Sequence, residues 1–251
     1  MNIAAVLRRS IPAQPVAALR TACRRAMAVA LLNLCALCGN SSRNVLCEAC
    51  DAAYWNEPRL RCPQCALPLA AWQSHRQRAP VGHRIDYRCD RCDRCDRCRA
   101  APPPFDATLA LADYRAPLDT LALDLKFRAR LAVGALFGER LARLAADAPT
   151  GSARPDLIVP APLSRQRLVE RGYNQAWAIA RSLARALGVR ADARRANVAG
   201  AFVAREVSGL HVGVVDDVMT SGATLAALAA TLKAAGARRV TNYVALRAAK
   251  D

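Results

Sequence analysis

The stretch VVDDVMTSGAT, residues 214–224, predicts both the fold class and the kind of ligand. Its apolar start completes a buried strand predicted over residues 212–215. Its TSGAT end turns into a predicted helix that Thr220 or Ser221 caps and that stops near Gly236. Ligands of open α/β sheets lie at the carboxyl ends of strands. We therefore expect a ligand site at the turn between this strand and this helix.

The residues of this stretch suit a phosphorylated ribose. A glycine-containing turn at a helix N-terminus presents backbone N–H groups to a phosphate. Asp216 and Asp217, at the end of the strand, would repel that phosphate unless a ribose diol donates hydrogen bonds to them and Mg²⁺ offsets the charge. The alternative is an ordinary capped turn with a solvated aspartate pair, and no Walker A motif is present. The expected phosphate ligands are Thr220, Ser221, Gly222, Ala223 and Thr224.

Short apolar strands alternate with helices on both sides of this stretch. This alternation predicts an α/β fold with a mainly parallel sheet that is covered by helices on both faces. Strands are predicted over 107–114, 157–159, 212–215 and 240–246, and helices over 118–126, 131–145 and 174–187 as well as after the TSGAT turn.

Eleven cysteines, all of them before Pro102, indicate metal binding rather than disulfides. A Cys-x2-Cys turn aims two sulfurs at one tetrahedral position, and two such turns complete a structural zinc site. Disulfides that staple a secreted fold would not normally leave the largest domain without cysteine. Redox chemistry is the alternative, but it requires a βαβ pattern that these cysteines lack. The first predicted site consists of Cys35, Cys38, Cys47 and Cys50.

The second predicted zinc site begins with Cys62 and Cys65. The repeat CDRCDRCDRC then offers four cysteines, of which only two can join this pair. We choose Cys95 and Cys98 because they adjoin the proline-rich boundary at 102–104. The other candidates stay open: Cys89 and Cys92 as spare or alternative ligands, His75 and His83 as replacements or solvated loop residues, and Cys23 as a lone thiol.

Composition allows one ordinary domain with a small additional module. The chain has 251 residues, 53% of them apolar, and a net charge of +17, which favours phosphates or nucleic acid as partners. A solvated arginine-rich surface would give the same charge. No apolar run reaches the length of about 18 residues that a membrane span needs, and no signal-peptide pattern occurs, so we expect a cytoplasmic protein. The predicted parts are a basic extension over 1–34, a double zinc-ribbon module over 35–101 and an α/β domain over 105–251.

Three further stretches carry a family resemblance: the Cys-x2-Cys module running into CRAAPPPFD (98–106), PAPLSRQRLVERGYNQA (160–176) and NVAGAF (197–202). With the TSGAT turn, they make the chain resemble the ComF family (ComFC-like) of type I phosphoribosyltransferase-like proteins over residues 34–246. The resemblance implies a double zinc ribbon followed by a phosphoribosyltransferase-like domain. It also implies that Asp216 and Asp217 hold the ribose of phosphoribosyl pyrophosphate (PRPP), while residues 220–224 hold its 5′-phosphate.

The same resemblance places residues 160–175 over the pyrophosphate, with Arg165, Arg167 and Arg171 as candidate cations. Three arginines followed by Gly172 after a strand already suggest an anion clamp, although a solvated helix would look the same. Lys126, in the string DLKF, also matches a family lysine.

Three functions remain open. The first is a phosphoribosyltransferase that displaces pyrophosphate from the anomeric carbon through an oxocarbenium-like state. The second is a non-catalytic zinc-ribbon module that binds single-stranded DNA, with DNA-uptake proteins of natural competence as partners, and the third is a regulator that senses PRPP. Residues 190–196 are shorter than the region in which phosphoribosyltransferases carry a loop that closes over the site and excludes water. Binding of PRPP or a nucleotide is therefore expected, while transfer stays open.

Overall fold

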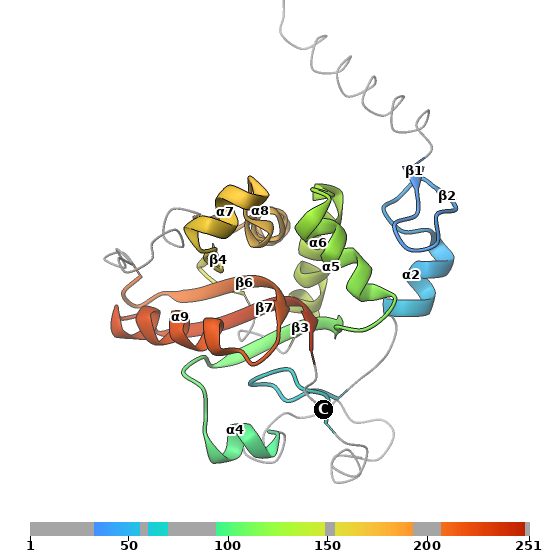
Figure 1. Cartoon of the computed structure of the whole chain (residues 1–251). Coiled ribbons are helices and arrows are strands. Elements are labelled where there is room, and N and C mark those ends of the chain that lie inside the picture. The colour runs from blue at the N-terminus through green and yellow to red at the C-terminus, as the bar shows by residue number, and fades with distance from the viewer. Residues whose placement is uncertain (1–32, 56–59, 70–93, 149–153, 193–206, 249–251) are drawn as a thin grey trace, which may run out of the picture. The chain divides into compact units, whose positions relative to one another are not determined.

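The computed structural model describes residues 33–55, 60–69, 94–148, 154–192 and 207–248 (Figure 1). The chain divides into two compact units, 1–50 and 51–251, and the division falls within helix α2 (Glu48–Trp55). The first predicted cysteine site lies in the smaller unit and the second in the larger one. The domain bounds given above divide the sequence and stay a prediction.

The smaller unit is built from contacts between near neighbours in the chain. Strands β1 (Asn33–Leu34) and β2 (Ser41–Ser42) pair antiparallel. The turn between them is closed by hydrogen bonds that the Cys35 N–H donates to the Asn40 carbonyl and the Gly39 N–H to the Cys35 carbonyl. Leu46, which precedes Cys47 in the sequence, is buried.

The larger unit contains a five-stranded sheet in the order β3-β7-β6-β4-β5, and every strand pair is parallel. This arrangement confirms the predicted α/β fold class. One strand is longer than predicted, because the ladder between β6 and β7 continues to the pair Met219 and Arg247. Asp216 and Asp217 therefore lie inside β6 rather than after its end. The strands are β3 (Ala107–Asp113), β4 (Leu157–Pro160), β5 (Arg190–Ala191), β6 (His211–Met219) and β7 (Arg239–Arg247).

Helices α6 (Leu131–Asp147) and α8 (Gln175–Leu187) cover one face of the sheet, together with α5 (Leu118–Phe127) (Figure 1). Gly138 lets α6 approach α8 closely, since a Cβ at this position would lie 2.6 Å from the Ile179 carbonyl oxygen. Helix α7 (Arg165–Arg171) carries the three arginines for which a solvated helix was the alternative to an anion clamp; Ser164 caps its start, and Gly172, at φ 74°, ends it.

The other face of the sheet is covered by α9 (Ala223–Ala234) and by the segments that carry the second cysteine site, including α4 (Asp96–Ala100). Cys62, Cys98 and Phe105 belong to the same buried cluster as Leu225 of α9 and Val244 of β7. The second cysteine site is thus part of the core of this unit. Within the described ranges, none of the helices has the length and hydropathy of a membrane span.

Candidate functional site

The turn after β6 passes into α9 through a glycine in the left-handed backbone conformation. Gly222, at φ 80°, is the N-cap of α9, so neither Thr220 nor Ser221 occupies the predicted cap position. The reason is the left-handed backbone, which glycine adopts without strain; a Cβ on Gly222 would also meet Met219 Cε at 2.5 Å. Ser221 still contributes, because its Oγ accepts a hydrogen bond from the Ala223 N–H at 3.3 Å.

The aspartate pair differs in exposure and in partners. Asp217 is 2% exposed and forms an ion pair with Lys126, whose Nζ lies 2.9 Å from Oδ2. Asp216 is half-buried and accepts a hydrogen bond from the backbone N–H of Asp217 at 2.9 Å. Lys126, at the end of α5, therefore neutralises one of the two carboxylates.

The surroundings of the aspartate pair raise the pKa values of nearby groups. Burial and the neighbouring Asp217 carboxylate raise the pKa of Asp216 well above that of an ordinary aspartate, and Lys126 offsets only part of this increase. Tyr173 belongs to the same electrostatic group, because Asp217 adds to the increase in the pKa of Tyr173 that burial causes. The Tyr173 hydroxyl is buried and has no hydrogen-bond partner within the described residues. The group can accept and donate hydrogen bonds to a polar ligand.

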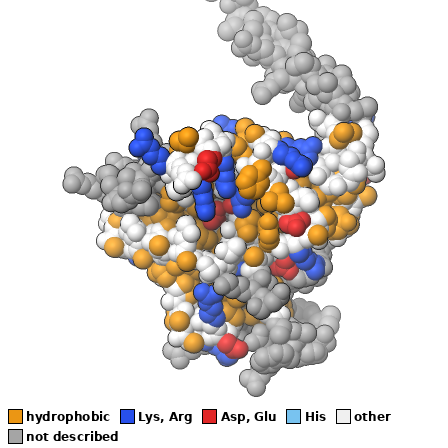
Figure 2. All heavy atoms as spheres, in the orientation of Figure 1, with side chains coloured by type: hydrophobic (Ala, Val, Ile, Leu, Met, Phe, Trp, Pro, Cys, Tyr) orange, Lys and Arg blue, Asp and Glu red, His pale blue; other side chains and the backbone are white. Residues whose placement is uncertain are grey.

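The three predicted arginines are not equivalent. Arg165 and Arg167 are exposed on α7, whereas Arg171 is half-buried and stacks its guanidinium over Phe127, 5.3 Å from the ring centroid. Since Phe127 follows Lys126, this contact brings the end of α7 next to the aspartate pair. Figure 2 shows acidic and basic side chains side by side over α7 and the adjoining part of β6.

Each described set of four cysteines is arranged for one tetrahedral ion. In both sets the sulfur atoms lie within 4.8 Å of one another; Cys38 Sγ lies 3.7 Å from Cys47 Sγ, and Cys65 Sγ lies 3.6 Å from Cys95 Sγ. Sulfurs about 2.3 Å from a shared zinc ion would be about 3.8 Å apart, whereas a disulfide requires about 2.05 Å. All eight cysteines are free thiols. The two clusters, Cys35/Cys38/Cys47/Cys50 and Cys62/Cys65/Cys95/Cys98, are compatible with two structural zinc ions.

The thiols of the second cluster differ in their pKa values. A hydrogen bond from the Cys65 side chain lowers the pKa of Cys62 to about 4, although burial opposes ionisation. Burial raises the pKa of Cys98 to about 12. Binding of a zinc ion would require these thiols to lose their protons.

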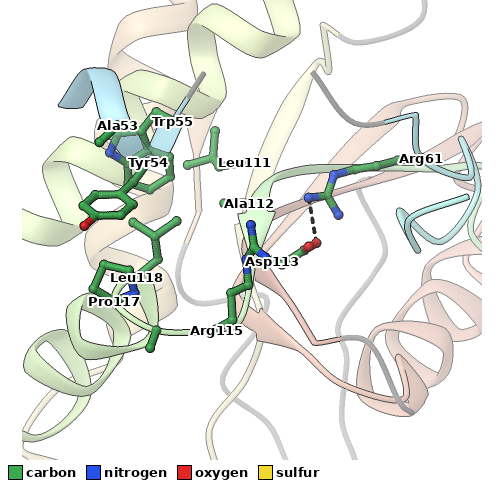
Figure 3. A pocket seen from close by; sticks show the side chains of 11 residues that line it. Ala53, Tyr54, Trp55, Arg61, Leu111, Ala112, Asp113, Arg115, Pro117 and Leu118 are labelled. Atoms are coloured by element: carbon green, nitrogen blue, oxygen red, sulfur yellow. Dashed lines mark ion pairs between the residues drawn. The ribbon is translucent and has the colours of Figure 1, made fainter. Parts of the chain in front are cut away.

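The second cysteine cluster is tied to the sheet at several points. The Thr108 N–H and hydroxyl of β3 donate hydrogen bonds to the carbonyls of Pro63, at 2.9 Å, and Gln64, at 2.7 Å. Arg61 pairs with Asp113 at 2.8 Å beside a cavity of about 210 Å³, which Tyr54 and Arg115 also line (Figure 3). These contacts hold the segment around Cys62 and Cys65 (the second-cluster knuckle) against β3.

Comparison with curated proteins identifies relatives over most of the chain. The DNA utilization protein YhgH of Salmonella typhimurium is 34% identical over 217 residues, which cover 78% of this chain and 87% of the relative. The protein of the same name from Escherichia coli strain K12 is 32% identical over the same shares. The chain belongs to the ComF family, as its motifs indicated. No family model matches this ComF protein.

Solved structures give a weaker likeness. A hypoxanthine-guanine phosphoribosyltransferase of Leishmania tarentolae in complex with GMP is 21% identical, with a TM-score of 0.31 over 47% of this chain and 65% of that one. A purine phosphoribosyltransferase of Pyrococcus horikoshii gives 17% and 0.29, over 47% of this chain and 82% of that one.

Sequence reasoning missed Arg247, which donates hydrogen bonds to the carbonyls of Met219 and Thr220. A single arginine that ends the apolar strand VTNYVALR is the only signal, and it gives no partner. The DLKF motif singled out Lys126, but the sequence did not indicate what this lysine does. The predictions for Cys23, His75, His83, Cys89, Cys92 and residues 197–202 lie outside the described residues.

Proposed function

We propose that this ComF protein binds PRPP, or a nucleotide, with Mg²⁺ at the carboxyl edge of β6. The observation that carries the proposal is an aspartate pair on the central strand of a parallel sheet, with Asp217 five residues before the glycine that caps the next helix. The loop suits the 5′-phosphate, and the carboxylates suit the ribose diol.

The pairing of Lys126 with Asp217 supports this assignment. Two free carboxylates beside a phosphate would repel it, but the ion pair leaves Asp216 as the less compensated charge. Asp216 is also the more exposed of the two, so it is the first acceptor for a ribose hydroxyl. The buried Tyr173 hydroxyl and the Arg171 guanidinium lie on the side from which α7 approaches, where the pyrophosphate would lie. Arg165 and Arg167, which are exposed on α7, are further candidate cations for the pyrophosphate, farther out than Arg171.

A transfer reaction is the catalytic form of the proposal. The bond between the anomeric carbon and the pyrophosphate oxygen breaks, its electron pair leaves with pyrophosphate, and the lone pair of an acceptor forms the new bond. Mg²⁺, when bound, supplies positive charge to the leaving group. Arg171 and the loop N–H groups stabilise charge at the two ends of the substrate. This makes the protein a glycosyltransferase whose acceptor is to be identified.

Isothermal titration calorimetry with PRPP and Mg²⁺ tests the binding step. The wild type is expected to bind, and the double variant Asp216→Asn/Asp217→Asn is expected to bind at least about tenfold more weakly, because it loses the charge that attracts the diol and the metal. Asp156→Asn is a matched control, since Asp156 lies at the opposite, amino-terminal edge of the sheet and contacts the His211 N–H. Absence of binding by the wild type would exclude the proposal.

Single-stranded DNA binding is a second candidate, favoured by the name of the YhgH relatives and by the net charge of +17. Contacts of Lys and Arg with phosphates release counterions, so the logarithm of the affinity should fall steeply with the logarithm of the salt concentration. We expect such a slope in fluorescence anisotropy with a labelled oligonucleotide. A slope near zero would exclude backbone-driven DNA binding, and with it a role of this kind in DNA uptake.

A further inference from the structure

Three consecutive backbone carbonyls, at the end of β6 and in the turn after it, accept hydrogen bonds from arginines on the side of the second cysteine cluster. Arg247 donates hydrogen bonds from Nη1 to the carbonyls of Met219, at 2.9 Å, and Thr220, at 2.5 Å. Arg97, in α4, donates from Nη2 to the Ser221 carbonyl at 3.3 Å. The backbone of the loop is therefore restrained by two side chains from other elements, Arg247 of β7 and Arg97 of α4.

Arg247 also connects this loop to the second cysteine cluster. Its Nε donates to the carbonyl of Cys65 at 2.8 Å, and its guanidinium also contacts the Ala248 carbonyl. Arg247 is 1% exposed, so water could not take the place of a lost partner, and breaking these hydrogen bonds would cost free energy. A small cavity of about 100 Å³ adjoins it, lined by Cys65, Arg97 and Ser221 among others. One buried guanidinium thus joins a predicted zinc ligand to the loop.

The direction of the carbonyls decides the direction of the amides. In a planar trans peptide the C=O of one residue and the N–H of the next point opposite ways. Carbonyls of Met219, Thr220 and Ser221 that face the cysteine cluster turn the N–H groups of the three following residues away from it. Phosphate binding requires N–H groups on one side and carbonyl oxygens on the other, because a carbonyl oxygen would repel the anion.

We infer that Arg247 is a positioning residue that, anchored on the second cysteine cluster, holds the loop at 219–222 in its anion-binding conformation, with Arg97 as a weaker second support. This inference rests on the proposed phosphate site. It gives the second cluster a role in ligand binding, beyond its place in the core. It also makes the loop depend on zinc, since the Cys65 carbonyl stays in place only while the cluster is intact.

Hydrogen–deuterium exchange of the loop amides tests the inference without a ligand. In Arg247→Gln we expect the peptide over 219–226 to exchange at least about tenfold faster, with zinc still at two ions per chain. The matched control is Arg61→Gln, because Arg61 also joins the second cysteine cluster to the sheet, but its bonds go to Asp113 and to the Ala66 carbonyl rather than to residues 219–222. Unchanged loop exchange in Arg247→Gln, or an equal increase in Arg61→Gln, would overturn the inference.

Zinc dependence is tested by one ligand from each cluster. Cys95→Ser is expected to accelerate exchange of the loop, and Cys38→Ser, in the smaller unit, is expected to leave it unchanged. Loss of zinc from the second cluster without any change in loop exchange would overturn the role of the cluster. Should Arg247→Gln fail to fold, Arg247→Lys keeps the charge but removes the guanidinium fork, and it should give a smaller increase of the same kind.

PRPP titration separates this inference from the proposed function. If the wild type binds, Arg247→Gln should lower the affinity at least about tenfold, Arg97→Gln about two- to threefold, and Arg61→Gln should leave it near that of the wild type. If the wild type does not bind, the proposed function fails, while the exchange measurements still decide whether Arg247 fixes the loop. Normal affinity in a folded Arg247→Gln variant would contradict the link to binding.

Discussion

The two cysteine clusters share a ligand set but differ in what surrounds them. The first joins cysteines 35–50 through local turns, and Cys38 in it is exposed. The second joins Cys62 and Cys65 to cysteines about 30 residues later and lies in the core that covers one face of the sheet. The first cluster therefore stabilises only a local turn structure. The second cluster takes the place of part of the helical layer that would otherwise cover this face of the sheet.

The largest expected difference between the clusters is in stability. Cys62→Ser removes a metal ligand from a fully buried position, so we expect it to lower the free energy of unfolding of the larger unit by about 3–5 kcal/mol. Cys35→Ser should leave that unit within about 0.5 kcal/mol of the wild type, because the first cluster lies outside its core. Thermal unfolding followed by near-UV circular dichroism, with zinc analysis, measures both. Equal losses would contradict the distinction.

Release of zinc should follow the same order. A chelator reaches the first cluster through the exposed Cys38, whereas Cys62 and Cys98 are buried. We expect two phases of release in a colorimetric chelator assay, with the second at least about tenfold slower, because it requires local opening of the core. Cys38→Ser should remove the fast phase and leave the slow one. A single phase in the wild type would mean that burial does not protect the second ion.

A smaller effect is expected from the hydrogen bonds around each cluster. Gln64 is 5% exposed, and its Nε2 donates to the carbonyls of Pro103, at 3.3 Å, and Phe105, at 3.2 Å. Gln64→Ala leaves both carbonyls without this donor and should cost about 1–3 kcal/mol in chemical denaturation. Ser42→Ala, the counterpart in the smaller unit, removes one acceptor for the Asn44 N–H and should leave the larger unit unchanged. A cost below about 0.5 kcal/mol for Gln64→Ala would indicate that the knuckle docks without it.

The smallest effect concerns pH and distinguishes the unit that carries the aspartate pair. The pKa of Asp216 is raised in the folded state, so the folded protein binds more protons than the unfolded one above about pH 4. Asp216 therefore lowers stability progressively as the pH rises from about 4 to its folded pKa, by about 1.4 kcal/mol for each pKa unit.

Asp216→Asn should accordingly match the wild type near pH 4 and become the more stable of the two toward neutral pH, in urea titrations at several pH values. Asp156→Asn serves as the control. An advantage of Asp216→Asn that is independent of pH would contradict the electrostatic explanation.

Much of the fold was readable from the sequence because its signals are local. Short apolar runs predicted β3 and β4, and apolar residues at helical spacing predicted α6 and α8, nearly at their observed bounds. Two boundaries failed for physical reasons. The ladder with β7 carried β6 past its aspartates to Met219, and Gly222 took the helix cap because its left-handed backbone suits that position better than a side-chain cap does. Helix α7 could be offered only as an alternative, because a seven-residue helix rich in arginine has no apolar periodicity.

What the sequence by itself determined are the groups whose chemistry depends on short spacing: paired Cys-x2-Cys turns, adjacent aspartates and a glycine turn at a helix start. Only the tertiary structure decided which distant groups meet them. Lys126 lies 91 residues before Asp217, and Arg247 reaches the carbonyl of Cys65 across 182 residues. Such contacts follow from how the sheet is covered, since the packing of buried faces brings together side chains whose separation along the chain leaves no periodic signal.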